Sequence, residues 1–383
     1  MAARNSRQRK RLCISLPRTP KSLYDEFGEM LLEALADSPY NAVLTADGDE
    51  SALNADLLLM IGDCMEFKGY ANLLGRSKVR PMTALWLLDT LPPATLSERA
   101  AKLGSRVGLY NKALHFMRSN MKSMVNFVPI SVRRKMGVST CAALLKGFEQ
   151  EVTDEQLKAL DTTSLYEVIG RFEWISRQMD NGWLGRIYTN TMPKKSFLDG
   201  AGIQSEFIPL GHHPRWGKEI DIERDIDVIF LGELAYGRRK PIVEYIQQEL
   251  ESRGINVTVV GGNCYGEERE RLLNRAKISL NVPRFPWDIP TIRVFMSVGC
   301  GSMVISEEMG NTAPFESGKH LYQAGVKELP EKIAYYLQND EAREEITRNA
   351  HELITQKLTL KNQVLKVLSA CEGDKSLTVQ KSA

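Results

Sequence analysis

Apolar runs alternate with amphipathic stretches through the first half of the chain. The run RLCISL precedes a stretch in which Leu23, Phe27 and Met30 recur at helical spacing. The runs NAVLTA and DLLLMIGD are short and mostly apolar and end in Asp/Gly turns, which is typical of buried parallel strands. The pattern predicts strands at 11–16, 41–46, 56–63, 82–90, 186–190 and 205–211, and helices at 21–38, 68–78 and 164–179.

The same rhythm starts again in the second half, after a break. The segment GHHPRWGKEIDIERD combines Gly, Pro and mixed charge, so we interpret residues 211–224 as an interdomain linker. Gly254 caps the first helix that follows, and glycines end a later one. The pattern predicts strands at 225–232, 256–262, 278–282 and 302–308, with helices at 237–254, 266–277, 288–301 and through 326–371.

Alternating strands and helices in both halves predict an α/β protein of two doubly wound, Rossmann-like domains that face a cleft. A chain of 383 residues is also long for one core. We expect the cleft at the carboxyl ends of the strands, where such sheets bind ligands. The expected division is a basic leader at 1–10, a first domain at 11–210 with a basic helical insert at about 99–148, the linker at 211–224, a second domain at 225–371 and a tail at 372–383.

Composition favours a cytoplasmic protein. Hydrophobic residues make up 43% and charged residues 26% of the chain, and no apolar run is long enough to span a membrane. The apolar stretch after the basic start is too short for a secretory signal. The six cysteines are scattered without a CxxC pair and the five histidines form no HExxH, so we expect neither a metal site nor a disulfide scaffold.

One segment carries a strong positive charge although the net charge is only +2. Between Glu98 and Glu149 there is no acidic residue, and apolar side chains separate the basic ones. Such a segment can grip an anionic acceptor or lie on the inner membrane face, with nucleic acid as an alternative partner. A solvated basic face of a helix pair would look the same. The residues that we expect on this surface are Arg118, Lys122, Arg133, Arg134 and Lys135.

The second half places cationic residues at predicted strand ends. No GxGxxG follows the first strand and no GxxxxGK[ST] occurs, which argues against a dinucleotide enzyme or a P-loop NTPase. Instead, Gly232 is followed by Arg238 and Lys240 just before a helix. Backbone amides at a helix start together with cationic side chains suit a diphosphate, although a basic helix start without a ligand is the alternative.

A second predicted helix start brings Arg293 to the same edge of the sheet. Glu307 and Glu308 end the next strand, where they could accept hydrogen bonds from ribose or sugar hydroxyls, or lie in a solvated turn. Asp225 and Asp227 form a DxD pattern, but they open a strand at its amino end, so we expect no metal there.

Residues from about 224 to 368 resemble the C-terminal domain of group 1 glycosyltransferases, in particular the spore-maturation-protein CgeB-like branch. The resembling stretches are RDIDVIFLG, LLNRAKISLNV, IRVFMSVGCGSMVISEE and APFESGKHLYQAGVKELPEKIAYYL. The resemblance implies a GT-B fold and transfer of a sugar from a nucleotide-sugar donor, without a tightly bound metal or cofactor. It implies that Arg238 or Lys240 neutralises the leaving diphosphate with help from Arg293. Asp89, at the end of a first-domain strand, would face the acceptor as a base, although an aspartate that only caps the strand end is the commoner alternative.

One position departs from the family pattern. Related enzymes usually carry glutamate where this chain has Met296, often with an acidic residue eight positions earlier, where Asp288 stands. Methionine cannot hold a ribose hydroxyl as a carboxylate does. Either Glu307 or Glu308 takes over, or donor binding is altered, or the chain is a non-catalytic GT-B relative that binds a nucleotide or a partner. A transferase acting on nucleic acid is the remaining alternative.

Overall fold

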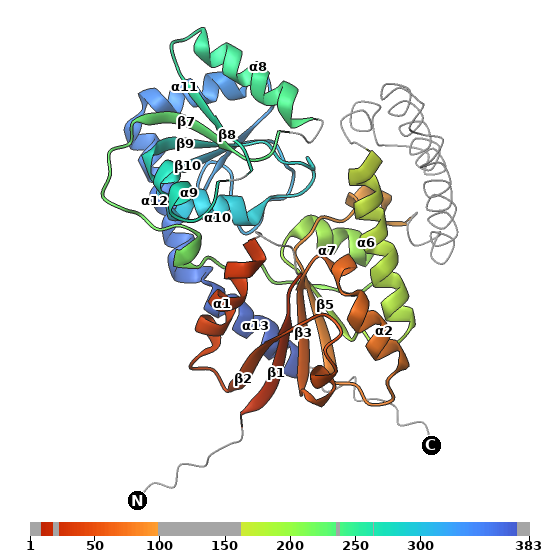
Figure 1. Cartoon of the computed structure of the whole chain (residues 1–383). Coiled ribbons are helices and arrows are strands. Elements are labelled where there is room, and N and C mark those ends of the chain that lie inside the picture. Colours follow the sequence, from red (N-terminus) through yellow and green to blue (C-terminus); the bar gives the residue numbers. More distant parts are fainter. Residues whose placement is uncertain (1–8, 18–22, 99–161, 235–237, 263, 374–383) are drawn as a thin grey trace, which may run out of the picture.

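The computed structural model describes residues 9–17, 23–98, 162–234, 238–262 and 264–373, which form two domains (Figure 1). The predicted basic insert at about 99–148 lies outside the described residues. So do the five basic residues expected to face an acceptor or a membrane, Arg118, Lys122, Arg133, Arg134 and Lys135. In the part of the chain that is described, no helix is long and apolar enough to cross a membrane.

The first domain contains a six-stranded sheet in the order β2-β1-β3-β4-β5-β6, with every pair parallel. Its central strand β3 is buried along its whole length, as its unbroken apolar sequence predicts. The strand order reverses between β1 and β3, so the crevice of this sheet lies there. The strands are β1 (Lys10–Ser15), β2 (Tyr40–Thr45), β3 (Leu57–Gly62), β4 (Met82–Leu87), β5 (Arg186–Thr189) and β6 (Glu206–Phe207).

Helices cover both faces of this sheet, and one of them was not expected. The helices are α1 (Leu23–Leu35), α2 (Lys68–Arg76), α6 (Thr162–Asp180) and α7 (Met192–Gly200), with short 3₁₀ turns at Glu50–Asn54, Cys64–Glu66 and Ala94–Leu96. The sequence analysis left the segment of α7 between two strands without a structure. Its start carries proline in the first turn, a position that proline favours, and Phe197 and Leu198 are buried.

The second domain contains a five-stranded parallel sheet in the order β11-β10-β9-β7-β8. The strand order reverses between β7 and β9. The short edge strand β11 was not predicted, because three residues are too few to show a periodicity. The strands are β7 (Ile226–Leu231), β8 (Val257–Val260), β9 (Ala276–Asn281), β10 (Met303–Glu307) and β11 (Tyr322–Ala324), and the helices are α8 (Arg239–Glu251), α9 (Gly266–Arg275), α10 (Thr291–Gly299), α11 (Leu329–Gln338) and α12 (Asp340–Glu352).

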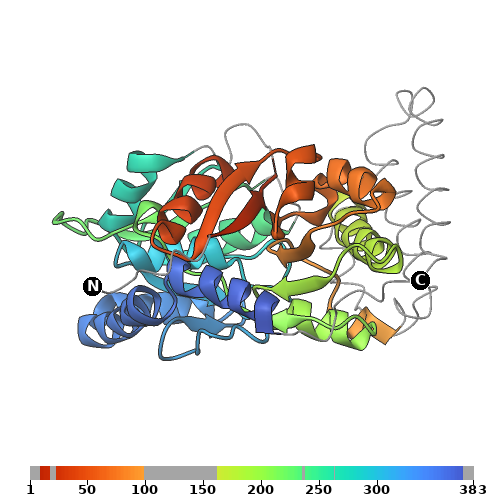
Figure 2. The same cartoon turned by 90° about the horizontal axis from the view of Figure 1, so that it is seen from below.

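The last helix, α13 (Leu360–Gly373), packs on the first domain although it follows the second in sequence (Figures 1 and 2). A π-helical turn at Leu353–Lys357 precedes it. The Tyr188 hydroxyl lies 3.4 Å from the sulfur of Cys371, and Lys10 pairs with Glu372 at 2.7 Å. The expected second domain of 225–371 therefore includes a helix that completes the first domain. The expected tail begins inside this helix, which ends at Gly373.

The first half of the segment expected to be a linker, 211–224, is packed between the domains, while most of 218–224 is exposed. Trp216 is fully buried, with ring centroids 5.4 Å from Phe27 of the first domain and 6.1 Å from Phe295 of the second. His212 donates its backbone N–H to Leu358 and accepts from Leu360, which joins the two crossings between the domains. The Gly- and Pro-rich sequence indicated a loop correctly, but its tryptophan makes the loop part of the core.

Candidate functional site

The carboxyl ends of the two sheets meet at the domain boundary. Thr90 follows β4 and Thr191 follows β5, and both hydroxyls donate to the carboxylate of Asp288, which follows β9. Parallel sheets bind ligands at their carboxyl ends, next to the point where strand order reverses. The two switch points therefore lie toward the same interdomain region.

Three arginines surround the end of β9 in the second domain. Arg238 donates to the Pro283 carbonyl at 2.8 Å, and Arg239 donates to the Val282 carbonyl at 2.9 Å. Arg293, from the first turn of α10, donates to Asn281 Oδ1 at 3.1 Å and weakly to the Val282 carbonyl at 3.4 Å. Three cationic side chains are thus gathered at the β7–β9 switch point, as an anion site requires.

The hydrogen-bond acceptors of Arg293 among the described residues are all neutral. Asn281 and Val282 accept its hydrogen bonds, and its guanidinium lies 5.8 Å from the centroid of the Phe230 ring. Burial lowers the pKa of Arg293 to about 10. Gly232 approaches it so closely that a Cβ there would lie 2.9 Å from Nη2, so glycine leaves the guanidinium room.

The other residues expected to bind the donor lie in different surroundings. Arg238 forms a two-pronged ion pair with Glu307, and each side chain is 10% exposed. Glu308 is exposed beyond the end of β10. Lys240 is 63% exposed and lies 3.7 Å from Glu244 one turn along α8. The structure thus brings Gly232, Arg238, Arg293 and Glu307 together and leaves Lys240 and Glu308 at the surface.

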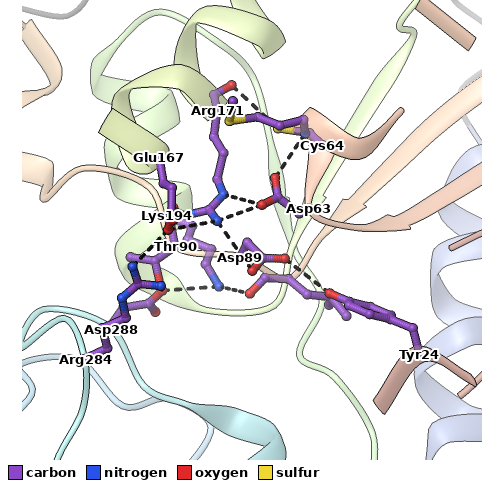
Figure 3. A network of polar contacts seen from close by, with 12 residues as sticks. Tyr24, Asp63, Cys64, Asp89, Thr90, Glu167, Arg171, Lys194, Arg284 and Asp288 are labelled. Atoms are coloured by element: carbon purple, nitrogen blue, oxygen red, sulfur yellow. Dashed lines mark hydrogen bonds and ion pairs between the residues drawn. The ribbon is translucent and has the colours of Figure 1, made fainter. Parts of the chain in front are cut away.

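Asp89 lies on the first-domain side of the boundary, just beyond β4 (Figure 3). Its side chain is 33% exposed, it accepts a hydrogen bond from the Tyr24 hydroxyl at 3.2 Å, and Arg171 lies 3.7 Å away. Arg171 also binds Asp63, at the end of β3, at 2.7 Å. Burial raises the pKa of Asp89, while the positive charge of Arg171 acts against this shift. This arrangement offers a partly desolvated carboxylate that solvent can reach.

Asp288 binds the first domain rather than standing open toward a donor. Its partners, besides the two threonines, include the ammonium of Lys194 on α7 at 3.3 Å (Figure 3). The sequence analysis missed Lys194 and Arg171. Nothing in the pattern marked either one, because α7 was unassigned and Arg171 stands in an ordinary amphipathic helix.

Met296, at the position of the family glutamate, is a core residue. It is 5% exposed and belongs to the apolar cluster that also contains Trp216 and Phe295. A Cβ added to Gly217 of the interdomain segment would lie 2.8 Å from the Met296 carbonyl oxygen. The interdomain segment thus lies against the backbone of α10, and methionine contributes to the apolar packing there.

Groups of metal-binding side chains do not occur in the part of the chain that is described. No cluster of three or more His, Cys, Asp or Glu residues with suitable geometry is present among those residues. Asp225 and Asp227 each bind a cation of the protein, Arg275 and Lys277, at 2.7 Å.

Comparison with known proteins bears on the fold and on the second domain. The model of the Glycosyl transferase-like family matches residues 225–369, which is the second domain and α13 but less than half of the chain. No curated protein matches the chain.

Three solved structures show the likeness of the whole chain. HepE of Anabaena in complex with UDP-glucose is 11% identical, with a TM-score of 0.53 over 94% of this chain and 99% of that one. The DNA modifying enzyme β-glucosyltransferase is 10% identical, with a TM-score of 0.52 over 94% and 99%. Sucrose-phosphate synthase of Thermosynechococcus elongatus is 10% identical, with a TM-score of 0.51 over 95% and 99%. The expected fold class is confirmed: the chain has the two-domain GT-B fold, and its second domain matches the Glycosyl transferase-like family.

Proposed function

We propose that this protein is a glycosyltransferase that moves a sugar from a nucleotide-sugar donor to a hydroxyl group of an acceptor. The diphosphate of the donor would lie at the β7–β9 switch point, against Arg293 and the start of α10. The acceptor would lie on the first domain, beside Asp89. A UDP-sugar is the first donor class to test, because HepE of Anabaena was solved with UDP-glucose.

The observation that carries this proposal is the charge of Arg293. A half-buried guanidinium is costly unless an anion balances it, and the partners of Arg293 among the described residues are neutral. Pyrophosphate at the end of β7, opposite Gly232, would supply the missing charge. Arg238 could join by turning from Glu307, which would leave that carboxylate to accept donor hydroxyls.

In the reaction, the acceptor oxygen forms a bond to the anomeric carbon while the bond to the diphosphate oxygen breaks. Asp89 takes the proton of the acceptor hydroxyl, and the guanidiniums stabilise the negative charge on the leaving diphosphate. The Tyr24 hydroxyl and Arg171 hold the carboxylate of Asp89 in place and favour its ionised form.

Calorimetry with UDP, ADP and GDP tests the donor site. Arg293→Met removes the charge but keeps the length of the side chain, and we expect UDP affinity to fall by about 1–3 kcal/mol. Arg253→Met is the matched control, because Arg253 is exposed beyond the far end of α8. Equal affinity of both variants and the wild type for all three nucleotides would contradict the proposed site.

Met296 favours a second candidate function, that of a GT-B relative that binds a nucleotide without transferring the sugar. A buried methionine cannot accept a ribose hydroxyl, and Asp288 is occupied by the first domain. Slow hydrolysis of a bound nucleotide-sugar separates the two, since an active transferase generally passes some donor sugar to water. Tight binding without hydrolysis of any donor would favour the binding protein.

The finer assignments from the sequence are part of the same proposal. They comprise membership of the CgeB-like branch, transfer without a tightly bound metal or cofactor, and a cytoplasmic location. The segment of about 99–148 would hold an anionic acceptor or the inner membrane face. Activity that persists in EDTA supports the metal-independent reaction. Binding to anionic liposomes compared with neutral ones tests the membrane surface. The salt dependence of retention on DNA or RNA tests the nucleic acid acceptor.

A further inference from the structure

Asp288 belongs to the second domain, but the side chains that bind it belong to the first. Thr191 donates to Oδ1 at 2.7 Å and Thr90 donates to Oδ2 at 2.8 Å. The ammonium of Lys194 lies 3.3 Å from Oδ2, and Asp288 is only 4% exposed. If the domains moved apart, the carboxylate would lose all three of these partners at once.

Lys194 forms its ion pair with the other domain, although the charge of Asp89 in its own domain also attracts it. It is 2% exposed, and it donates to the Leu88 carbonyl at 2.7 Å and to Asn190 Oδ1 at 2.6 Å within its own domain. Its ion pair in the described structure is with Asp288. A buried ion pair with satisfied hydrogen bonds fixes one arrangement of its neighbours more than it adds stability.

The residues on either side of this pair belong to the two halves of the proposed active site. Asp288 lies three residues before α10, whose first turn carries Arg293. Thr90 directly follows Asp89, and the Leu88 carbonyl that binds Lys194 directly precedes it. Two further contacts connect the same segments: Asn190 donates to Thr291 at 3.0 Å, and Trp287 donates to the Leu91 carbonyl at 2.9 Å.

We propose that Asp288 and Lys194 form an interdomain latch that sets the distance between the anion site at Arg293 and the carboxylate of Asp89. Both are positioning residues, since their observed partners are protein groups. The latch requires only that the two domains open and close. Its effect on turnover rests on the proposed transferase function.

Asp288→Asn is the central variant, because asparagine keeps the shape and one accepting oxygen but removes the charge opposite Lys194. We expect a larger radius of gyration in small-angle scattering and faster hydrogen exchange in 88–91 and 285–291, with exchange in the centres of β3 and β9 unchanged. Lys194→Met should do the same, and the double variant should add little to either single one. Lys195→Met is the matched control, since the neighbouring Lys195 pairs with Asp199 inside the first domain.

Turnover gives a second test, because a purely structural role of Asp288 would not change kcat and UDP affinity in the way described next. We expect kcat to fall about tenfold or more in Asp288→Asn, because a small displacement of the reacting groups is costly, while UDP affinity changes less than about threefold. Wild-type scattering and exchange in Asp288→Asn would overturn the latch. Uniformly faster exchange in both domains would also overturn it, because it would show general unfolding. Thr191→Val, which removes one hydrogen bond and no charge, provides a milder variant if Asp288→Asn does not fold.

Scattering and exchange do not require catalysis, so the two proposals can fail separately. Opening of the domains in Asp288→Asn without any donor turnover in the wild type would support the latch and count against the transferase. Turnover in the wild type that Asp288→Asn leaves unchanged, with closed domains, would support the transferase and overturn the latch.

Discussion

Replacing Arg293 by methionine should change stability and ligand affinity in opposite directions. Burial lowers the pKa of Arg293 to about 10. At neutral pH the guanidinium is charged in both the folded and the unfolded protein, so the lowered pKa means that the folded protein bears a cost of about 3 kcal/mol for holding this charge. The hydrogen bonds to Asn281 and Val282 together offset about 2 kcal/mol of this cost. Methionine should therefore raise the free energy of unfolding by about 1 kcal/mol.

The same substitution should weaken UDP binding by about 1–3 kcal/mol, or roughly 5- to 150-fold, since a charge-assisted contact to the diphosphate is lost. Urea unfolding followed by tryptophan fluorescence measures the first quantity, and titration calorimetry measures the second. If the charge of Arg293 is held for a ligand, the gain in stability and the loss of UDP affinity should occur together. A loss of more than about 2 kcal/mol of stability with unchanged UDP affinity would refute this reasoning, because Arg293 would then be a structural residue.

Three further predictions concern pH, the base and the interdomain core. Burial lowers the pKa of His212 to about 4, so as pH falls the imidazole takes up a proton in the unfolded chain before it does so in the folded protein. The free energy of unfolding should therefore be full above pH 6.5 and fall by about 3 kcal/mol as pH drops to 4. Urea unfolding should find this dependence on pH reduced in His212→Gln. Tyr24→Phe should raise the pKa of Asp89 further, because the hydroxyl that favours the carboxylate is gone, and the acidic limb of the kcat/KM profile should move to higher pH while the basic limb stays. Trp216→Ala should cost about 3–5 kcal/mol in the same unfolding assay, and a loss below about 1 kcal/mol would contradict its place in the core.

The sequence predicted the fold well because most of the strands are buried on both faces. Runs such as DLLLMIGD are apolar without interruption, and they mark parallel strands whatever their neighbours are. The helix α7 and the edge strand β11 were not predicted, because elements this short contain too few residues to show a clear periodicity. The expected domain limits differ from the structure where distant packing decides, because periodicity shows that α13 is amphipathic but not which domain it covers.

Part of the candidate site could be predicted from the sequence for a similar reason. Residues that follow strands of one parallel sheet gather at one edge, so Gly232, Arg238, Arg293 and Glu307 lie together as expected. Which cations face one another and which face solvent depends on side-chain directions, and the exposed Lys240 was not distinguishable from Arg238. The contacts of Asp288 with the first domain depend on how two domains pack, and no local pattern records that packing.

The two crossings between the domains restrict how these domains can move. The segment at His212 and the segment at Leu358–Leu360 lie side by side and are hydrogen-bonded to each other in both directions. Two connections that are hydrogen-bonded to each other should limit the twisting of one domain against the other more than a single connection would. We therefore expect the domains to open along a single path, with the reacting groups returning to the same alignment at each closure. Neither domain should fold well when expressed alone, because cutting the chain near residue 211 separates α13 from the sheet that it covers.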